Sequence, residues 1–319
     1  MKVVKLILYF LIAALLTTAL PFSGIFIPLL FILSGALFVA MSVKWNIIFS
    51  FLSAAISAVL IYLLSGMLVT SIAFPLISLL SAVGIFVALK LKWSLKMIIL
   101  AGTTGYFVLI ITAYFLYGGT FVADIINIIK AFVLESLDSI KNSVPAGSDM
   151  TTFEEVKSMY GLYFENLKVL APSIILSSFF LLSYFTLKVS SHFAPKNEAY
   201  SDIPAFSEIH APVYFVFAGV ISYAGQLASG TFISGLMANI FMALSVYYTV
   251  CGYSFADFLV KSRIKSLSAR LAIYLGVTLL LTLVSAIFYF ANPILIAMLL
   301  GLLDSIFNYR LKIRMLKGK

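Results

Sequence analysis

The chain is poor in the side chains from which catalytic and metal sites are built. Charged residues make up 10% of its 319 residues, against about 25% in ordinary soluble domains. There are only two histidines, His192 and His210, and one cysteine, Cys251. A single cysteine excludes an internal disulfide and any cysteine-rich metal cluster. We therefore expect no bound metal and no cofactor.

Several enzyme motifs are missing as well. The chain contains no glycine-rich phosphate loop ending in Lys-Ser or Lys-Thr, so that route to ATP hydrolysis is closed. It has no His-Glu-x-x-His sequence, no Gly-x-Ser-x-Gly elbow and no pair of intramembrane aspartates. We expect a protein that is not an enzyme and has no ATPase of its own.

Apolar sequence is abundant instead. Hydrophobic residues make up 63% of the chain, and their runs approach the roughly 20 residues needed to cross a bilayer. The first run shows no small-residue cleavage site, so we expect it to remain as a span. The pattern predicts an all-α, polytopic membrane helix bundle of about ten transmembrane helices, with eight or nine as the alternative. The ten candidate spans are residues 5–20, 24–42, 46–64, 67–89, 97–117, 170–190, 210–228, 231–252, 268–290 and 293–309.

The basic residues are sorted between alternate gaps. Of the 21 Lys and Arg residues, 17 fall on one side of the ten spans, and the other four share the opposite side with seven acids. Basic residues near span ends stay on the cytoplasmic side of a membrane. We therefore expect both termini in the cytoplasm and a multi-pass protein of the bacterial cytoplasmic (inner) membrane. Because the sorting explains the net charge of +9, we expect lipid contact and no nucleic-acid partner.

The longest gap, residues 118–168, is predicted to lie on the outer side. Residues 121–142 form an amphipathic pattern typical of a helix on a membrane surface. Thr152 and Glu155 have the spacing of a capping box, which predicts a second helix over residues 153–167. Such a hairpin either covers apolar helix ends or acts as a lid over an outward-facing cavity.

A polar cytoplasmic linker at residues 191–209 divides the chain. It separates a predicted six-span half, residues 1–190, from a predicted four-span half, residues 210–319. No internal repeat relates the two halves, so an inverted-repeat transporter is not predicted.

Asp304 is the acidic residue that falls inside a predicted span. It lies six residues before Arg310, or about 9 Å deeper along a continuous helix. An ionised carboxylate at that depth needs a partner, and Arg310 or Arg263 is within reach from the cytoplasmic end. Asn308, at i+4, is predicted to share its face. The cluster is either a structural ion pair or a contact with a substrate or partner.

Four other polar residues fall in or beside predicted spans: Asn46, Gln226, Asn239 and Asn292. Hydrogen bonding between helices is the ordinary role of such groups in a membrane. Asn239 and Gln226 join Asp304, Asn308 and Arg310 as candidate substrate or partner contacts.

The C-terminal sequence Gly301-Leu-Leu-Asp304-Ser-Ile-Phe-Asn308-Tyr-Arg310 follows a span that contains Pro293. It resembles the C-terminal signature of the YybS-like family of bacterial polytopic membrane proteins. Where that family more usually has an acidic residue near the arginine, this chain has Asn308.

The N-terminal half of that family is similar to the substrate-binding membrane subunits of energy-coupling-factor transporters. Those subunits have about six spans and bind vitamins or metal ions in an outward-facing pocket. The resemblance implies a small-molecule binding half at residues 1–190 and a separate energising ATPase as partner.

Two functions remain open at this point. The leading one is transporter-like capture or translocation of a small molecule without an ATPase of its own, which requires an energising ATPase or another membrane protein as partner. The alternative is a membrane scaffold or regulatory protein that docks cytoplasmic or envelope partners.

Overall fold

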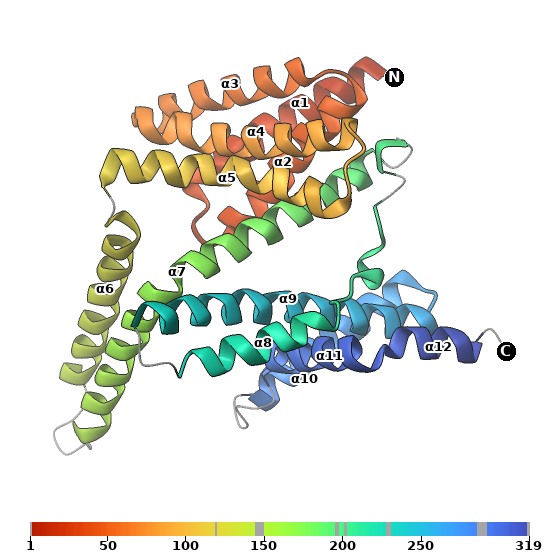
Figure 1. Cartoon of the computed structure of the whole chain (residues 1–319). Coiled ribbons are helices and arrows are strands. Elements are labelled where there is room, and N and C mark those ends of the chain that lie inside the picture. Colours follow the sequence, from red (N-terminus) through yellow and green to blue (C-terminus); the bar gives the residue numbers. More distant parts are fainter. Residues whose placement is uncertain are drawn as a thin grey trace. The chain divides into compact units, whose positions relative to one another are not determined.

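The computed structural model is helical throughout the part of the chain that it describes (Figure 1). The chain forms two compact units: unit 1 comprises Met1–Ser143 and Ser178–Ile203, and unit 2 comprises Val144–Ser177 and Pro204–Lys319. The predicted halves, residues 1–190 and 210–319, follow one another along the sequence, whereas these two units interleave. The units do not test the predicted halves, which remain a prediction. The described residues are 2–118, 120–143, 150–194, 198–200, 203–227, 231–285 and 292–317.

Unit 1 contains six helices and the C-terminal part of a seventh. Two short 3₁₀ turns, η1 and η2, separate the first two helices, which are therefore distinct spans and not one broken span. A third turn, η3 (Glu198–Tyr200), follows the last helix. The elements are α1 (Lys2–Ala19), η1 (Leu20–Phe22), η2 (Gly24–Phe26), α2 (Ile27–Lys44), α3 (Ile47–Ser65), α4 (Leu68–Lys90), α5 (Leu95–Tyr117), α6 (Phe121–Ser143) and the end of α7 (Met150–Phe193).

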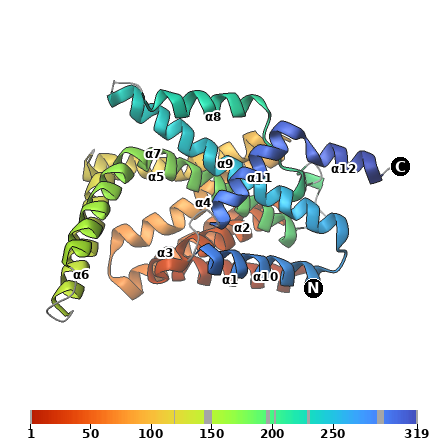
Figure 2. The same cartoon turned by 90° about the horizontal axis from the view of Figure 1, so that it is seen from below.

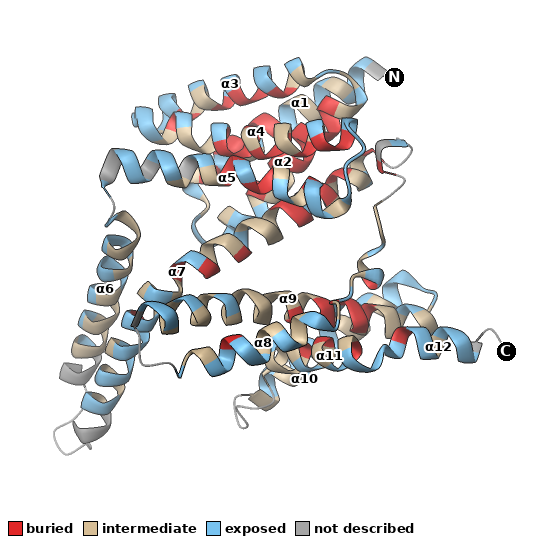
Figure 3. Cartoon of the chain, in the orientation of Figure 1, coloured by how far each residue is buried: buried red, intermediate tan, exposed pale blue. Residues whose placement is uncertain are grey.

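The core of unit 1 surrounds α2. Every residue of α2 from Ser34 to Ser42 is buried, and the buried residues of unit 1 gather there and on α4 (Figure 3). A helix that is apolar around its whole circumference is expected to lie inside a bundle. The composition of α2 fits that position, because its only charged residue, Lys44, is the last residue of the helix.

Unit 2 is built on the long helix α9, which packs against α8 and α11. Two glycines allow α9 and α11 to cross closely: a Cβ at Gly252 would lie 1.7 Å from the Ala297 carbonyl oxygen, and one at Gly301 would lie 2.1 Å from that of Tyr248. The elements are the start of α7, η4 (Phe206–Glu208), α8 (Tyr214–Gly225), α9 (Thr231–Arg263), α10 (Leu267–Ser285), α11 (Pro293–Phe307) and α12 (Tyr309–Lys317).

Within the described residues, eight helices are long and apolar enough to span a membrane, or nine if α11 and α12 form one bent span. This number confirms a polytopic helix bundle and agrees with the alternative of eight or nine spans. The predicted span at 210–228 accounts for the difference. Its helix, α8, has 12 residues and is therefore about 18 Å long, well short of the hydrocarbon thickness of about 30 Å.

The second half of the predicted outer hairpin is helical, as expected, but it is not a separate helix. A helix at 153–167 and a span at 170–190 are instead one helix, α7, of 44 residues. Its first residue is Met150, so Thr152 lies inside the helix and not at the N-cap position that the sequence predicted. No turn-forming sequence separates the two predicted segments, and Pro172 is accommodated within α7. The first half, α6, agrees with the predicted amphipathic helix.

Two of the polar span residues have a local role and not the predicted interhelical one. Asn46 accepts a hydrogen bond from the backbone N–H of Ile48, and Asn292 accepts one from that of Ile294. Each is the N-cap of the helix that follows it. An Asn at this position satisfies one of the free N–H groups of the first turn.

Candidate functional site

Asp304 and Arg310 form a buried ion pair in unit 2. The Arg310 Nε donates to Asp304 Oδ2 at 2.8 Å, and the two side chains are 7% and 4% exposed, arginine first. Residues six apart lie about 240° around a regular helix, so a straight helix would keep them apart. The helix breaks at Asn308, and α12 bends by 67° from α11 (Figure 2). That bend returns the guanidinium to the carboxylate.

The Arg310 side chain also joins α12 to α9 and to η4. Its Nη1 donates to the Ser207 carbonyl at 2.6 Å and to the Ser254 hydroxyl at 3.1 Å. Its Nη2 donates to the Cys251 carbonyl at 3.2 Å. The backbone N–H of Arg310 lies 3.4 Å from Asp304 Oδ1. One guanidinium therefore binds groups from three separate segments of unit 2.

Aromatic rings enclose the same guanidinium. The Arg310 Cζ lies 5.7 Å from the ring centre of Phe255 and 5.9 Å from that of Phe258. Arg314, one turn further along α12, lies 5.5 Å from the Phe258 ring and 3.6 Å from the Glu208 carboxylate. The beginning of α12 is thus fixed by charge and by aromatic contact, while Arg314 remains more than half exposed.

The network has little capacity left for a ligand. A guanidinium has five N–H donors, and the Arg310 side chain makes four hydrogen bonds to groups of the protein. A buried ion pair persists only when such additional bonds satisfy both partners. The geometry favours a structural tie over a substrate contact for Asp304 and Arg310.

Asn308 lies between Asp304 and Arg310 in the sequence, but its side chain takes no part in their ion pair. It is exposed, and it ends α11 in the left-handed conformation, with φ 48° and ψ 50°. Asn tolerates that conformation better than other residues with a side chain, because its short polar group bonds locally. The role of Asn308 is therefore to set the bend, and the predicted common face with Asp304 is wrong.

Asn239 repairs a weak point in α7. Its Nδ2 donates to the Val169 carbonyl at 2.7 Å, and its Oδ1 accepts from the Ser173 N–H at 3.1 Å. Val169 and Ser173 are i and i+4 partners in a helix, and Pro172, which has no N–H, lies between them. A side-chain amide that satisfies backbone groups beside a proline is how membrane helices tolerate the residue. Asn239 thus joins α9 to α7.

Gln226 makes local contacts at the end of α8. Its side-chain Nε2 lies 3.5 Å from the Ser222 carbonyl, and its backbone carbonyl accepts a hydrogen bond from the Ser234 hydroxyl at 2.9 Å. Of the five candidate contact residues, the structure therefore brings only Asp304 and Arg310 together. A role in binding substrate or partner stays a prediction for all of them.

The two histidines bond to nearby carbonyls. His192 Nδ1 lies 2.9 Å from the Lys188 carbonyl in unit 1, and His210 Nδ1 lies 3.0 Å from the Glu208 carbonyl in unit 2. No group of three or more His, Cys, Asp or Glu side chains suited to a metal ion occurs among the residues that the structure describes.

Asp257 is a second buried carboxylate that the sequence interpretation missed. The predicted span stopped at residue 252, but α9 continues to Arg263 and places Asp257 on its buried side. The carboxylate accepts from the Lys261 amine at 2.6 Å and from the Tyr274 hydroxyl at 2.5 Å. The i, i+4 spacing of Asp257 and Lys261 was the available signal, since such pairs are adjacent on a helix.

Asp257 and Tyr274 line a groove between α9, α10 and α11. Its volume is about 400 Å³, and apart from these two polar groups its walls are almost entirely apolar. We call this feature the unit 2 groove. Its lining residues are Phe206, Gly252, Tyr253, Ala256, Asp257, Val260, Ile273, Tyr274, Val277, Thr278, Leu281, Pro293, Ile296, Ala297 and Leu300.

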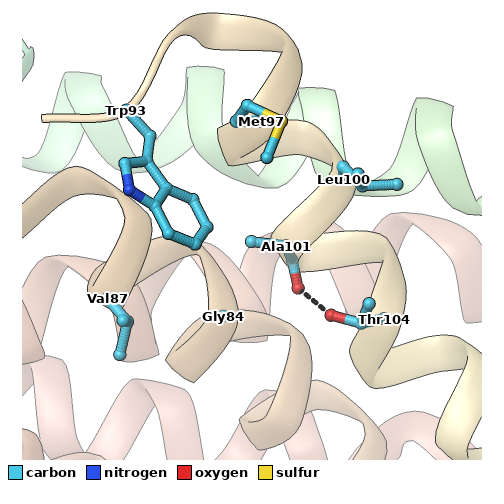
Figure 4. A pocket seen from close by; sticks show the side chains of 7 residues that line it. All are labelled: Gly84, Val87, Trp93, Met97, Leu100, Ala101 and Thr104. Atoms are coloured by element: carbon cyan, nitrogen blue, oxygen red, sulfur yellow. Dashed lines mark hydrogen bonds between the residues drawn. The ribbon is translucent and has the colours of Figure 1, made fainter. Parts of the chain in front are cut away.

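Unit 1 has a smaller notch between α4 and α5 (Figure 4). The notch has a volume of about 380 Å³, and the Trp93 ring lies along it. The two helices cross closely here: a Cβ at Gly84 would lie 2.1 Å from the Ala101 carbonyl oxygen, and one at Gly105 would lie 2.3 Å from the Ser81 nitrogen. Small residues at these positions thus allow α4 and α5 to pack closely. No charged side chain lines the notch.

The fold and these sites define a multi-pass α-helical membrane protein that contacts the lipid bilayer. The chain belongs to the family described as "Predicted membrane protein (DUF2232)", whose model matches residues 7–305. No curated protein and no solved structure matches it.

Proposed function

We propose that this protein captures an amphipathic small molecule in the unit 2 groove, as a transporter-like component of the bacterial cytoplasmic membrane. The supporting observation is the groove itself, an apolar recess with one polar cluster. Small-molecule sites are typically recesses of about 300–1,000 Å³, with mostly apolar walls and a few polar groups that orient the ligand. At about 400 Å³ the unit 2 groove is within that range.

The groove contains one polar cluster, Asp257 and Tyr274, that could orient a ligand. Asp257 projects from α9 and Tyr274 from α10, and their hydrogen bond joins the two walls. Asp257 is 8% exposed, so its carboxylate is largely desolvated, and polar contacts gain strength in such surroundings. By contrast, the Asp304–Arg310 network is already occupied by protein groups. For this reason we place capture at the groove.

The resemblance to the YybS-like family and to energy-coupling-factor subunits would place capture at residues 1–190 instead. In unit 1 the described residues form a core joined by hydroxyl hydrogen bonds, together with the uncharged notch. Neither feature offers a charged group to orient a ligand as Asp257 does. The same resemblance supports an addition to the proposal, which is that a separate ATPase supplies the energy for transport.

Mass spectrometry of the purified protein tests capture. The full-length chain is isolated from native membranes in mild detergent, and its extract is compared with those of two variants. Ala256→Phe fills the unit 2 groove, while Ala224→Phe adds the same ring to the exposed face of α8. We expect a compound that is retained by the parent and by Ala224→Phe and is lost from Ala256→Phe. Equal retention in all three, or none in any, would refute capture in the groove.

A membrane scaffold remains the second candidate function. The observation that favours it is α12, which exposes Leu311, Met315 and Leu316 together with basic residues. An exposed basic helix can attract and dock an acidic partner. Crosslinking in native membranes separates the two functions. If two ATPase subunits are crosslinked to the protein, capture is supported. If one other protein is crosslinked and the purified protein retains no small molecule, a scaffold is supported.

A further inference from the structure

We propose that the ligand of the unit 2 groove has an anionic head group, a phosphate or a carboxylate, at the end of the groove nearest the α9–α10 connector. Its apolar tail lies along α10. This inference rests on the proposed function, because it specifies the ligand of the same site. The argument follows from the charges around Asp257 and from the shape of the groove.

The negative charge of Asp257 is already compensated. Lys261 donates to one carboxylate oxygen at 2.6 Å, and Tyr274 donates to the other at 2.5 Å. A cationic head group would have to share these oxygens with the Lys261 ammonium, whose positive charge would repel it. A carboxylate with both oxygens engaged by donors is therefore unsuited to recognise a cation.

Arg270 provides a positive charge that this cluster does not use. It lies four residues before Tyr274 on α10, and residues at that spacing share one face of a helix. Tyr274 lines the groove, so Arg270 lies one turn closer to the connector on the same side. Its Nε is buried and has no hydrogen-bond partner in the described part of the chain. A buried donor without an acceptor costs free energy that an anionic ligand would recover.

The connector adds to the positive charge at this end of the groove. Arg263 is the last residue of α9, Lys265 lies in the short segment between α9 and α10, and both are exposed. After Lys261 and Asp257 cancel, three cations remain here: Arg263, Lys265 and Arg270. A concentration of one charge beside low-dielectric walls attracts ions of the opposite sign.

The remaining wall of the groove suits a hydrocarbon tail. On α10 the groove extends from Ile273 to Leu281, eight residues or about 12 Å along the axis. Val277 lies between them on the same wall, and Ala297 and Leu300 of α11 lie on another. A molecule with a charged head and an apolar tail would place each part against matching groups.

Binding of probes that share one tail tests the head-group assignment. Affinities of the full-length protein in detergent are measured for dodecyl phosphate, dodecanoate, dodecanol and dodecyltrimethylammonium, with inorganic phosphate alone as a further arm. We expect the two anionic probes to bind at least tenfold more tightly than the other two. If inorganic phosphate binds as tightly as dodecyl phosphate, the ligand is a free anion and the tail assignment is wrong.

Two variants locate the binding. Arg270→Gln should weaken dodecyl phosphate binding about tenfold, as loss of one charge-assisted hydrogen bond predicts, and leave dodecanol unchanged. Lys96→Gln removes one exposed positive charge from unit 1 and should leave both probes unchanged. Equal loss in the two variants would indicate general electrostatic attraction and overturn the role of Arg270.

Failure of the inference and failure of the proposed function give different results. If Ala256→Phe weakens every dodecyl probe equally and Arg270→Gln weakens none, the groove binds ligands and only the anionic head group is wrong. If Ala256→Phe changes the binding of none of the probes, the groove is not a binding site and both proposals fall.

Discussion

The two units solve the problem of polar groups inside a membrane protein in different ways. The buried polar side chains of unit 1 are hydroxyls, such as Ser34 and Ser78, whose oxygens lie 2.8 Å apart. Among the described residues, every buried charged side chain lies in unit 2: Asp257, Asp304 and Arg310. Unit 1 therefore resembles a packed bundle, and unit 2 a bundle with specific electrostatic contacts.

The difference has a physical cause. A hydroxyl can bond to the carbonyl one turn earlier in its own helix, as Ser57 does to Ser53 at 2.8 Å, so it stays satisfied wherever the helix lies. A buried charge has no such local partner and requires groups from other segments at fixed positions. Hydroxyls thus allow helices to adjust, whereas the Asp304–Arg310 pair specifies one arrangement.

Removing one charge of that pair should have the largest effect. Arg310→Leu leaves Asp304 buried without its partner, and we expect a loss of about 3–5 kcal/mol in the free energy of unfolding. The double change Asp304→Leu with Arg310→Met should recover most of the loss, because it leaves no unpaired charge. The measurement is heat or denaturant unfolding of the purified protein, followed by size-exclusion chromatography.

Arg314→Gln is the matched control for that experiment. It breaks the exposed contact with Glu208 and should cost less than about 1 kcal/mol. If Arg310→Leu unfolds no more easily than Arg314→Gln, the pair is not a structural tie, and a substrate or partner contact becomes the better interpretation of Asp304.

A medium effect is expected at the junction of α7 and α9. Asn239→Leu removes the amide that joins Val169 and Ser173, and it should cost about 1–2 kcal/mol. In a Pro172→Ala background the backbone of α7 can satisfy itself, so the same change should cost less. A double-mutant cycle measures that difference. Strict additivity of the two changes would show that Asn239 does not serve the proline.

The smallest effect is expected in unit 1. Ser34→Ala and Ser78→Ala together remove one hydroxyl pair, and the coupling between them should be about 0.6 kcal/mol, the average for such bonds in membranes. Ser139→Ala, at an exposed position on α6, is the control. A coupling as large as that of Asp304 with Arg310 would remove the distinction between the two units.

The span pattern was predictable from the sequence because it depends on local composition. Nine of the ten predicted spans coincide with the eight spanning helices and the bent pair. The importance of Asp304 was also predictable, since a carboxylate in an apolar run needs a partner. The choice between Arg310 and Arg263 was not, because it depends on a bend at Asn308 that the sequence does not reveal.

Contacts between distant residues explain the rest of what was missed. The continuity of α7 through Pro172 depends on Asn239, which is 66 residues from its partner Ser173. The polar cluster of the groove depends on the hydrogen bond from Tyr274 of α10 to Asp257 of α9. Composition and periodicity describe one segment at a time, so neither contact could be derived from them.

The members of the Arg310 network lie far apart in the chain. The carbonyl of Ser207 is synthesised 103 residues before the guanidinium that binds it, and the Ser254 hydroxyl 56 residues before. Until Arg310 is synthesised, these groups therefore lack the guanidinium that joins η4, α9 and α11. Only when the ribosome has added Arg310 can one side chain close all three segments at once. The arrangement is thus completed by a residue that follows every other member of its network in the chain.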